Sequence, residues 1–422
     1  MKAVCTILLA CLAWQPLLRA GDTLTVDQVR DLALQTNPLQ QKKALAESVA
    51  ALQLRNIRGN NLPRIQAGAQ AGWQSDVFRF PVDNPAFDVP EIPKDQYKFT
   101  LDVSERLWDG GSDRYLRQQR ELERDLTLAQ TDVDVFQLRE TVTDLYFKVL
   151  LLQENEAILN ASVEYLQNRL RQAEAAVAGG AALRTAADQI RIQILQTEQQ
   201  LAAVRADQQS LKTILATWIG RPDTDFHLRS PQSVIRNPQS AILRPEYRLF
   251  ELQQRNLQLA QDKLRLQIQP RVELFAQGGL GRPNPFNFFE TGFEPFAIFG
   301  LRALWTPVDW GNRGRERQIL ALQAGAIDAQ RQAFDRRLQA LTQKDQADQA
   351  KAQALLAQDD AIIALQEDIV RRAEAQVQNG VMTTTDYLAQ VNLLTQARLT
   401  RKTHEIQALQ AQEMLNAKVR QD

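Results

Sequence analysis

Cysteine and histidine are almost absent from this chain of 422 residues, and their scarcity excludes several classes of site. The two cysteines, Cys5 and Cys11, lie near the N-terminus, so disulfide bonds, thiol catalysis and cysteine-rich metal sites are not expected elsewhere. The two histidines, His227 and His404, are too few to supply a histidine-metal site. We therefore expect neither a metal ion nor another cofactor.

Neither sign of charge is in excess, because 50 lysines and arginines balance 50 aspartates and glutamates. This balance argues against nucleic acid as a partner. The sequence also lacks a nucleophile elbow, a phosphate-binding loop and a histidine–carboxylate pattern, so we do not expect an enzyme. Acidic pairs such as Asp359 and Asp360 fall on helical heptads, and we expect them on solvated faces.

No apolar run after the N-terminus approaches the roughly 20 residues that a membrane-spanning helix needs. Residues 1–20 combine a basic start at Lys2, a short apolar stretch and a small residue at Ala20, which is the pattern of a signal peptide. We expect cleavage after Ala20. One alternative stays open, because residues 8–11 resemble a lipoprotein box in which Cys11 would be lipidated. Under either interpretation the protein leaves the cytoplasm.

Glycine and proline are missing from residues 112–178 and 181–219, so nothing in these stretches stops a helix. Residues of the second stretch step by four and three, as in a coiled-coil seam. The members of this seam are Ile190, Ile194, Thr197, Leu201, Val204, Gln208, Leu211, Leu215 and Trp218. Residues 315–378 and 381–422 repeat the design. We therefore predict two helical hairpins, with tips at Gly179-Gly180 and Asn379-Gly380.

The two hairpins belong to an internal repeat. Asn37-Pro38 and Arg244-Pro245 open similar helices 207 residues apart, and Asp109-Gly110-Gly111 matches Asp309-Trp310-Gly311 at an offset of 200. We predict a duplicated plan of a helix, a β-hairpin and a long helical hairpin. The expected divisions are a signal peptide (1–20), a first repeat (21–221, with a β-hairpin at 64–108), a linker (222–245) and a second repeat (246–422, with a β-hairpin at 271–306).

The predicted strands alternate apolar and polar residues over about ten positions, as transmembrane β-strands do. The apolar positions are Ile65, Ala67, Ala69, Ala71 and Trp73, then Tyr97, Phe99, Leu101 and Val103, then Val272, Leu274 and Ala276, then Phe299, Leu301, Ala303 and Trp305. The fourth strand is less regular, because Ile298 and Leu304 fall on its polar side. A half-buried sheet in a water-soluble protein shows the same alternation.

Aromatic residues favour the membrane interpretation, because 16 of the 28 in the chain fall within residues 73–108 and 270–310. Such clustering is typical of an interfacial aromatic girdle. The girdle residues that we expect are Trp73, Tyr97, Phe99, Trp108, Phe299 and Trp305. Four strands cannot close a barrel and an open edge is costly in lipid, so several chains must share one barrel. A trimer with twelve strands is the natural expectation.

Several short phrases, in this order and spacing, resemble the outer-membrane efflux family of TolC-like channels. They are Ala33-Leu34-x-x-Asn37-Pro38, Leu107-Trp108-Asp109-Gly110-Gly111, Ile219-Gly220-Arg221-Pro222 and Arg244-Pro245-Glu246-Tyr247. The resemblance implies a mainly α homotrimer with a 12-stranded outer-membrane β-barrel on a long periplasmic α-barrel. It also implies a Gram-negative outer membrane and its lipid, a periplasmic adaptor (membrane fusion protein) and an inner-membrane transporter, in efflux or type I secretion.

The same resemblance suggests site residues near the hairpin tips. Asp386 matches a position whose three copies would line the periplasmic entrance and favour cations; an ordinary helix cap is the alternative. The charged latch of some members is missing, because Met382 replaces its base and Ala186 its acid. Arg184 with Asp188 is a substitute that we consider.

The tips themselves would dock the adaptor, through Gly179, Gly180, Asn379, Gly380 and Thr383. An alternative function stays open, since a periplasmic coiled-coil adaptor or a structural tether also contains long helices. An adaptor would need one helical hairpin and compact β domains, whereas two hairpins and two aromatic strand pairs are predicted here. The exported substrate is not specified by the sequence.

Overall fold

A computed structural model describes residues 22–77, 92–231, 244–287 and 290–419. The predicted signal peptide with Cys5 and Cys11 lies outside the described residues, as do Phe78, Phe80, Phe87, Phe288 and Phe289. The chain divides into two compact units. The helical unit comprises residues 1–40, 132–245 and 334–422, and the sheet unit comprises residues 41–131 and 246–333. Each unit contains segments from both halves of the repeat.

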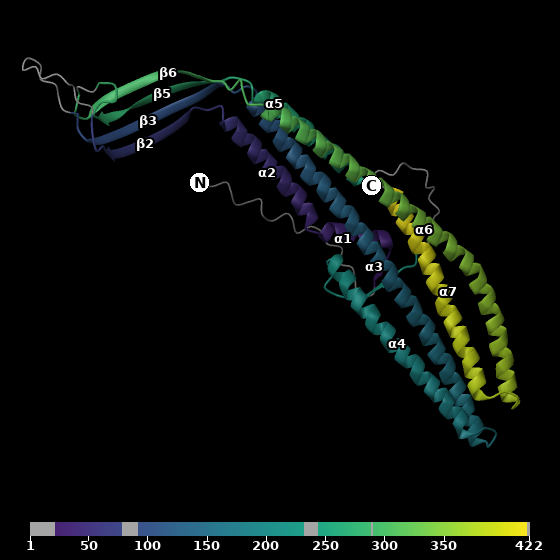
Figure 1. Cartoon of the computed structure of the whole chain (residues 1–422). Helices are drawn as coiled ribbons and strands as arrows, with labels where there is room; N and C mark the ends of the chain where they lie inside the picture. Colours follow the sequence, from purple (N-terminus) through teal and green to yellow (C-terminus); the bar gives the residue numbers. More distant parts are fainter. Residues whose placement is uncertain (1–21, 78–91, 232–243, 288–289, 420–422) are drawn as a thin grey trace, which may run out of the picture. The chain divides into compact units, whose positions relative to one another are not determined.

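The sheet unit contains four antiparallel strands in the order β2 (Arg64–Trp73), β3 (Asp95–Trp108), β5 (Arg271–Arg282) and β6 (Glu294–Leu304), which lie side by side in Figure 1. The two predicted β-hairpins are confirmed, and β6 ends two residues before the expected boundary. Strand β3 carries an irregularity between Arg106 and Trp108, where its register against β5 shifts.

Two helices of the sheet unit precede its strand pairs, as the repeat predicts. They are α2 (Leu39–Gly59) and α5 (Pro245–Leu266). A small core forms where Leu252 of α5 packs with Leu122 and Ala129 of the long helix α3. This core includes no residue of the strands, and apolar side chains of the sheet such as Ile65, Phe99 and Phe299 are exposed.

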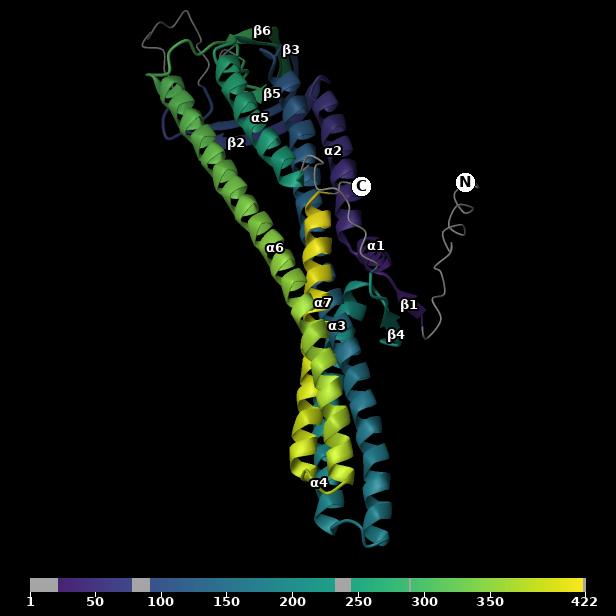
Figure 2. The same cartoon turned by 90° about the vertical axis from the view of Figure 1, so that its right-hand side faces the viewer.

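Four long helices dominate the rest of the chain: α3 (Ser112–Ala178), α4 (Arg184–Trp218), α6 (Asn312–Gln378) and α7 (Thr384–Val419). Helices α3, α4 and α7 lie in stretches without glycine or proline, whereas α6 contains Gly314 and Gly325 and is nevertheless one helix. The two predicted hairpins lie side by side near their tips (Figures 1 and 2). A shared core holds the hairpins together there, with Leu166, Ile190, Val370 and Val391 each contributed by a different helix. In the described part of the chain, no helix has the length and hydrophobicity required to cross a membrane.

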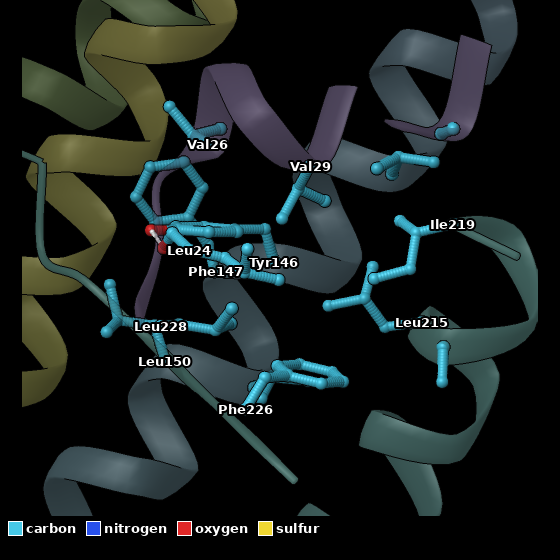
Figure 3. Close-up of a cluster of buried hydrophobic side chains, with 14 of the residues drawn as sticks. Leu24, Val26, Val29, Tyr146, Phe147, Leu150, Leu215, Ile219, Phe226 and Leu228 are labelled. Atoms are coloured by element: carbon cyan, nitrogen blue, oxygen red, sulfur yellow. Dashed lines mark hydrogen bonds between the residues drawn. The ribbon is translucent and has the colours of Figure 1, made fainter. Parts of the chain in front are cut away.

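The main core of the helical unit surrounds two short strands that the sequence did not reveal (Figure 3). Strand β1 (Asp22–Leu24) pairs in parallel with β4 (Phe226–Leu228), inside the expected linker. Next to them lies α1 (Val26–Thr36), which begins at a capping box between Thr25 and Gln28. The three-residue strands carry no readable alternation, so only their tertiary contacts define them.

Buried polar groups fix these strands in the core. Tyr146 has a fully buried hydroxyl that can donate to the carbonyl oxygen of Leu24, 3.1 Å away, or to that of Arg229. Burial raises the pKa of Tyr146 well above its ordinary value, so the hydroxyl stays protonated. The amide of Gln153 accepts from the backbone N–H of Leu228 and donates to its carbonyl, both at 3.0 Å. The side chain therefore acts like a neighbouring strand.

The N-terminal and C-terminal segments of the helical unit meet at one side chain. Arg30 of α1 lies 3.2 Å from Glu413 of α7, although the two residues are 383 positions apart in sequence. The same guanidinium donates through its Nε to the hydroxyl of Thr143, at 2.9 Å. One arginine therefore joins α1, α3 and α7.

Two expectations about the helices are wrong. Asp359 is buried and lies 2.5 Å from Nδ1 of His404, so this member of the acidic pair does not belong to a solvated face. Asp360 is exposed, as expected, and pairs with Arg401. Trp218 is exposed although it ends the predicted seam, because α4 stops there and Ile219 enters the core in its place.

Candidate functional site

One face of the sheet is apolar except at positions such as Glu105, which stands opposite Leu274, and Asp95, which stands opposite Trp73 at the end of β2. The strand register places Ala69, Phe99 and Leu280 in one cross-strand row, and alternation carries the pattern along every strand. This apolar face contains Ile65, Ala67, Ala69, Ala71, Trp73, Tyr97, Phe99, Leu101, Val103, Trp108, Val272, Leu274, Ala276, Leu280, Ala297, Phe299, Leu301 and Ala303, and Trp305 follows β6. Phe299 is 84 % exposed, and Trp73 and Leu301 are also largely exposed. An uncovered apolar surface of this size marks an interaction site.

The opposite face of the sheet is polar and carries an internal hydrogen-bond network. Asp102 lies at its centre and accepts from the hydroxyl of Thr100, at 2.9 Å, and from the amide of Gln277. The carbonyl of that amide is 3.5 Å from the ammonium of Lys98. A face of this composition suits contact with water.

Aromatic rings on this polar face lie flat against the sheet instead of projecting from it. Phe275 stands opposite Gly300, and a Cβ built on that glycine would lie only 3.1 Å from the ring. The guanidinium of Arg302 lies 4.9 Å from the centre of the Phe275 ring, within cation–π range. Phe296 supports Lys98 in the same way, at 5.4 Å. Positive charges are therefore held on the water-facing side.

The sheet has two open edges. Within the described residues, no strand pairs with the outer side of β2 or of β6. Both edges expose backbone N–H and C=O groups that another strand could satisfy. Because β2 and β6 run in opposite directions, β6 of one chain could pair in antiparallel fashion with β2 of another.

The hairpin tips contain glycines in the left-handed backbone conformation. Gly180 has a φ of +73° and Gly380 a φ of +70°, as the sequence predicts for the tip turns. At each tip the residue after the glycine donates its N–H back into the preceding helix, over 2.8 Å in both cases. Nothing lies within 4 Å of the position that a Cβ would take at either glycine, so both tips face open space.

Asp386 lies in the first turn of α7 and is exposed. Its carboxylate accepts a hydrogen bond of 2.6 Å from the hydroxyl of Thr383, and its N–H donates to that hydroxyl over 3.2 Å. This is a helix cap, as one of the two interpretations expected. The cap leaves the carboxylate at the surface, so the geometry is compatible with both interpretations.

The substitute latch that we considered does not form within one chain. The carboxylate of Asp188 pairs with Arg191, at 3.0 Å, and not with Arg184. Arg191 also reaches Glu174 of the preceding helix, at 2.6 Å. The side chain of Met382, the residue that replaces the base of the family latch, packs against the shared core of the hairpins.

A polar cluster that the sequence analysis missed joins the two hairpins. The hydroxyls of Tyr165 on α3 and Tyr387 on α7 lie 2.6 Å apart. Arg169 stacks on the Tyr165 ring and pairs with Glu374 of α6. Each tyrosine interrupts a helical seam of otherwise aliphatic residues. This interruption is the sequence signal from which the polar cluster could have been predicted.

Known proteins share this sequence pattern and this fold. Residues 29–221 match the family model described as outer membrane efflux protein. No curated protein matches the chain. Among solved structures, the outer membrane protein VceC of Vibrio cholerae is 15 % identical with a TM-score of 0.70, and the match covers 93 % of this chain and 94 % of VceC.

Two further solved channels have similar scores. CmeC of Campylobacter jejuni is 15 % identical, with a TM-score of 0.68 over 93 % of this chain and 85 % of CmeC. MtrE of Neisseria gonorrhoeae is 16 % identical, with a TM-score of 0.66 over 93 % of this chain and 88 % of MtrE. At such identities the likeness shows the fold.

Proposed function

Because this chain belongs to the outer membrane efflux protein family, we propose that it is one subunit of an outer-membrane channel. The channel would receive substrates from a periplasmic adaptor and an inner-membrane transporter and release them outside the cell. The observation that carries this proposal is the exposed apolar face of the sheet, backed by a polar face. Such a sheet matches lipid on one side and a water-filled lumen on the other.

The open edges of the sheet favour a homo-oligomer, in which strands of neighbouring copies would pair. Four strands are too few for a barrel, and the open edges of β2 and β6 would cost several kcal/mol for each unpaired backbone group in lipid. Four strands per chain keep every contact antiparallel when β6 of one subunit meets β2 of the next. Three copies provide twelve strands, enough for a lumen, whereas two copies leave little space.

Exposed apolar residues on the long helices support the same assembly. Ile192 and Leu195 on α4 are exposed, as are Ile362, Leu365 and Ile369 on α6. Leu365 is 68 % exposed and Leu195 is 64 % exposed. Exposed apolar residues of this kind become buried when helices of neighbouring subunits pack as coiled coils.

The hairpin tips are the surface that we assign to the adaptor, and they comprise Gly179, Gly180, Asn379, Gly380 and Thr383. Open space around both glycines allows a partner to approach the backbone closely. Replacing Gly180 and Gly380 with a bulky residue should abolish export while oligomers still assemble. If these variants fail to assemble, the two glycines have only a structural role and do not form a docking surface.

The proposal is tested with the mature protein, extracted from outer-membrane fractions and added to a planar bilayer. We expect heat-resistant trimers in those fractions and discrete conductance steps in the bilayer. A monomer recovered from the periplasm, without conductance, would contradict the channel and favour the adaptor or tether.

A further inference from the structure

Arginines gather on the polar face of the sheet, at the end where the strands join the helices. The register places Arg106, Glu273 and Arg302 in one cross-strand row. Arg64 begins β2 and lies in the next row of the same face, and Arg271 begins β5 and shares the side of Glu273 by alternation. All four arginines are exposed. In these rows of the described strands, four guanidinium groups therefore stand against a single carboxylate.

Most of this positive charge is not balanced within the chain. Among the described residues, no carboxylate lies within ion-pair distance of Arg64, Arg271 or Arg302. Arg106 differs, because its guanidinium lies 3.7 Å from the carboxylate of Asp113. We therefore define the arginine surface as Arg64, Arg271 and Arg302.

Arg302 is oriented without the use of its N–H groups. Its guanidinium lies 4.9 Å from the centre of the Phe275 ring, within cation–π range. The ring can lie against the sheet because Gly300 stands opposite it and has no side chain. Within the described residues Arg302 donates no hydrogen bond, so its N–H donors remain available to an oxyanion.

The rest of the polar face carries a different balance of charge. Farther along the strands, the ammonium of Lys98 is accompanied by the carboxylates of Asp102 and Glu294. A face that needs charge only for solubility mixes the two signs along its length. Here positive charge is concentrated at one end, and such a concentration attracts anions.

Assembly of the proposed oligomer would add to the arginine surface. When β6 of one copy pairs with β2 of the next, the incoming strand contributes no acidic residue, and Arg64 is its only charged residue. Strand β6 ends and β2 begins at the same end of the sheet, so Arg302 of one copy would lie near Arg64 of the next. Neighbouring strands are about 4.8 Å apart, which is less than the Debye length of about 8 Å at physiological ionic strength. A multivalent anion would therefore interact with several guanidinium groups at once.

We propose that the arginine surface is an oxyanion-binding site in the wall of the channel, and that multivalent organic anions are among the solutes that the channel passes. Guanidinium groups bind the oxygens of sulfonate, phosphate and carboxylate groups through paired N–H donors, and rings of arginine or lysine select anions in pores. The proposal rests on the proposed function, since it requires the polar face of the sheet to line a water-filled lumen. The rival occupant is an acidic segment of a neighbouring copy, which would leave no room for a solute.

The test measures block of the assembled channel in a planar bilayer by pyrenetetrasulfonate, an organic anion, added to both chambers. Block is measured in preference to overall ion selectivity, because the proposed carboxylates of Asp386 act on the same current. We expect Arg302→Gln to raise the half-blocking concentration about threefold. The triple substitution Arg64→Gln, Arg271→Gln and Arg302→Gln should raise it about tenfold.

Lys98→Gln is the matched control. It removes the same charge from the same face, and Lys98 also lies over an aromatic ring, 5.4 Å from the centre of Phe296. We expect this substitution to change the half-blocking concentration little. If it weakens block as much as Arg302→Gln does, the effect is one of overall charge and the arginine surface is not a site. Block of the triple variant at the concentration that blocks the parent would overturn the site as well, and would favour the rival occupant.

A second measurement tests the class of solute. In a gradient of potassium naphthalene disulfonate, the reversal potential gives the permeability of the organic dianion relative to potassium. The triple variant should lower this ratio about twofold, and an unchanged ratio would refute organic anions as solutes.

Two further outcomes separate this proposal from the proposed function and from folding. Absence of conductance in the parent protein would overturn the proposed function itself, whereas a conducting parent without block would overturn only the arginine surface. If the triple variant does not assemble, the comparison of Arg302→Gln with Lys98→Gln decides the proposal, because each removes one side chain from the polar face.

Discussion

The hydroxyl groups of Tyr165 and Tyr387 form a hydrogen bond of 2.6 Å between helices that are 222 residues apart in sequence. Burial, followed by the hydrogen bond with Tyr165, raises the pKa of Tyr387 above its ordinary value, so the hydroxyl of Tyr387 stays protonated under physiological conditions. With the ion pair between Arg169 and Glu374, this bond joins the α3–α4 hairpin to the α6–α7 hairpin close to their tips. Separation of the tips requires these bonds to break.

Removing the tyrosine pair should loosen the tips. Because one hydrogen bond contributes about 1 kcal/mol, we expect Tyr165→Phe and Tyr387→Phe to show a coupling energy of about this size in a double-mutant cycle of unfolding. In planar bilayers, the double variant should open more often than the parent channel. A coupling energy of zero would mean that the hydroxyls do not act on each other.

Tyr146 provides a test of the main core. Tyr146→Phe removes the hydroxyl that can donate to the carbonyl oxygen of Leu24 or of Arg229, and the loss of one hydrogen bond costs about 1 kcal/mol. We expect a lower midpoint of urea unfolding and faster amide exchange in β1. Tyr115→Phe is the matched control, because within the described residues Tyr115 makes no hydroxyl hydrogen bond, and it should change the midpoint little. Equal effects of the two substitutions would contradict this role of Tyr146.

Asp386 can be tested by separating its charge from its cap. Asp386→Asn keeps an acceptor for the Thr383 hydroxyl and removes the carboxylate, so helix stability should hold while cation selectivity falls in a bilayer. Thr383→Ala should do the reverse, with a loss of about 1 kcal/mol and unchanged selectivity. If Asp386→Asn conducts with the selectivity of the parent, the proposed carboxylate ring does not exist.

Lys212 makes stability depend on pH in a defined direction. Burial lowers its pKa, and the attraction of Glu156 and Asp225 offsets this only in part, so the unfolded chain binds the proton more tightly. The charged lysine therefore destabilises the fold at neutral pH, and stability rises as the pH passes through the folded pKa toward the unfolded value of about 10.4.

Lys212→Met should therefore raise the unfolding midpoint at neutral pH, and its advantage should shrink as the pH rises through the lowered folded pKa of Lys212 toward the unfolded value of about 10.4. Lys148→Met is the control, because Lys148 is exposed and pairs with Asp144 at 2.7 Å. This control should show no such gain. An advantage of Lys212→Met that stays constant across this pH range would refute the assignment.

The long elements were predictable because their signals are local. Residues 112–178 contain no helix breaker and fold into one helix with those bounds, and strict alternation located β2 and β3. The tip glycines were also predictable, since a turn with positive φ requires them. Features that depend on one residue or on a regular period can be read without tertiary contacts.

The remaining features depend on partners that are distant in sequence. Asp359 looked solvated because its partner, His404, lies 45 residues away on another helix. The pairing of β1 with β4 involves three residues on each side, too few to show a period. The Tyr165–Tyr387 bond joins seams that were identified separately, and no rule of periodicity predicts which two will meet.

The ion pair between Arg30 and Glu413 has a consequence for the time course of biogenesis. Helix α1 is held by Glu413, which lies close to the C-terminus. Strand β1 cannot pair until β4, about 200 residues later in the sequence, is present. Closing such long loops is slow, and an incomplete chain exposes the residues of the main core. With residues 1–20 as the predicted signal peptide, we expect the N-terminal half to stay unfolded and protected until translocation has almost ended. We expect chains that end before Glu413 to be degraded by proteases rather than to form defective channels, because they lack this last contact.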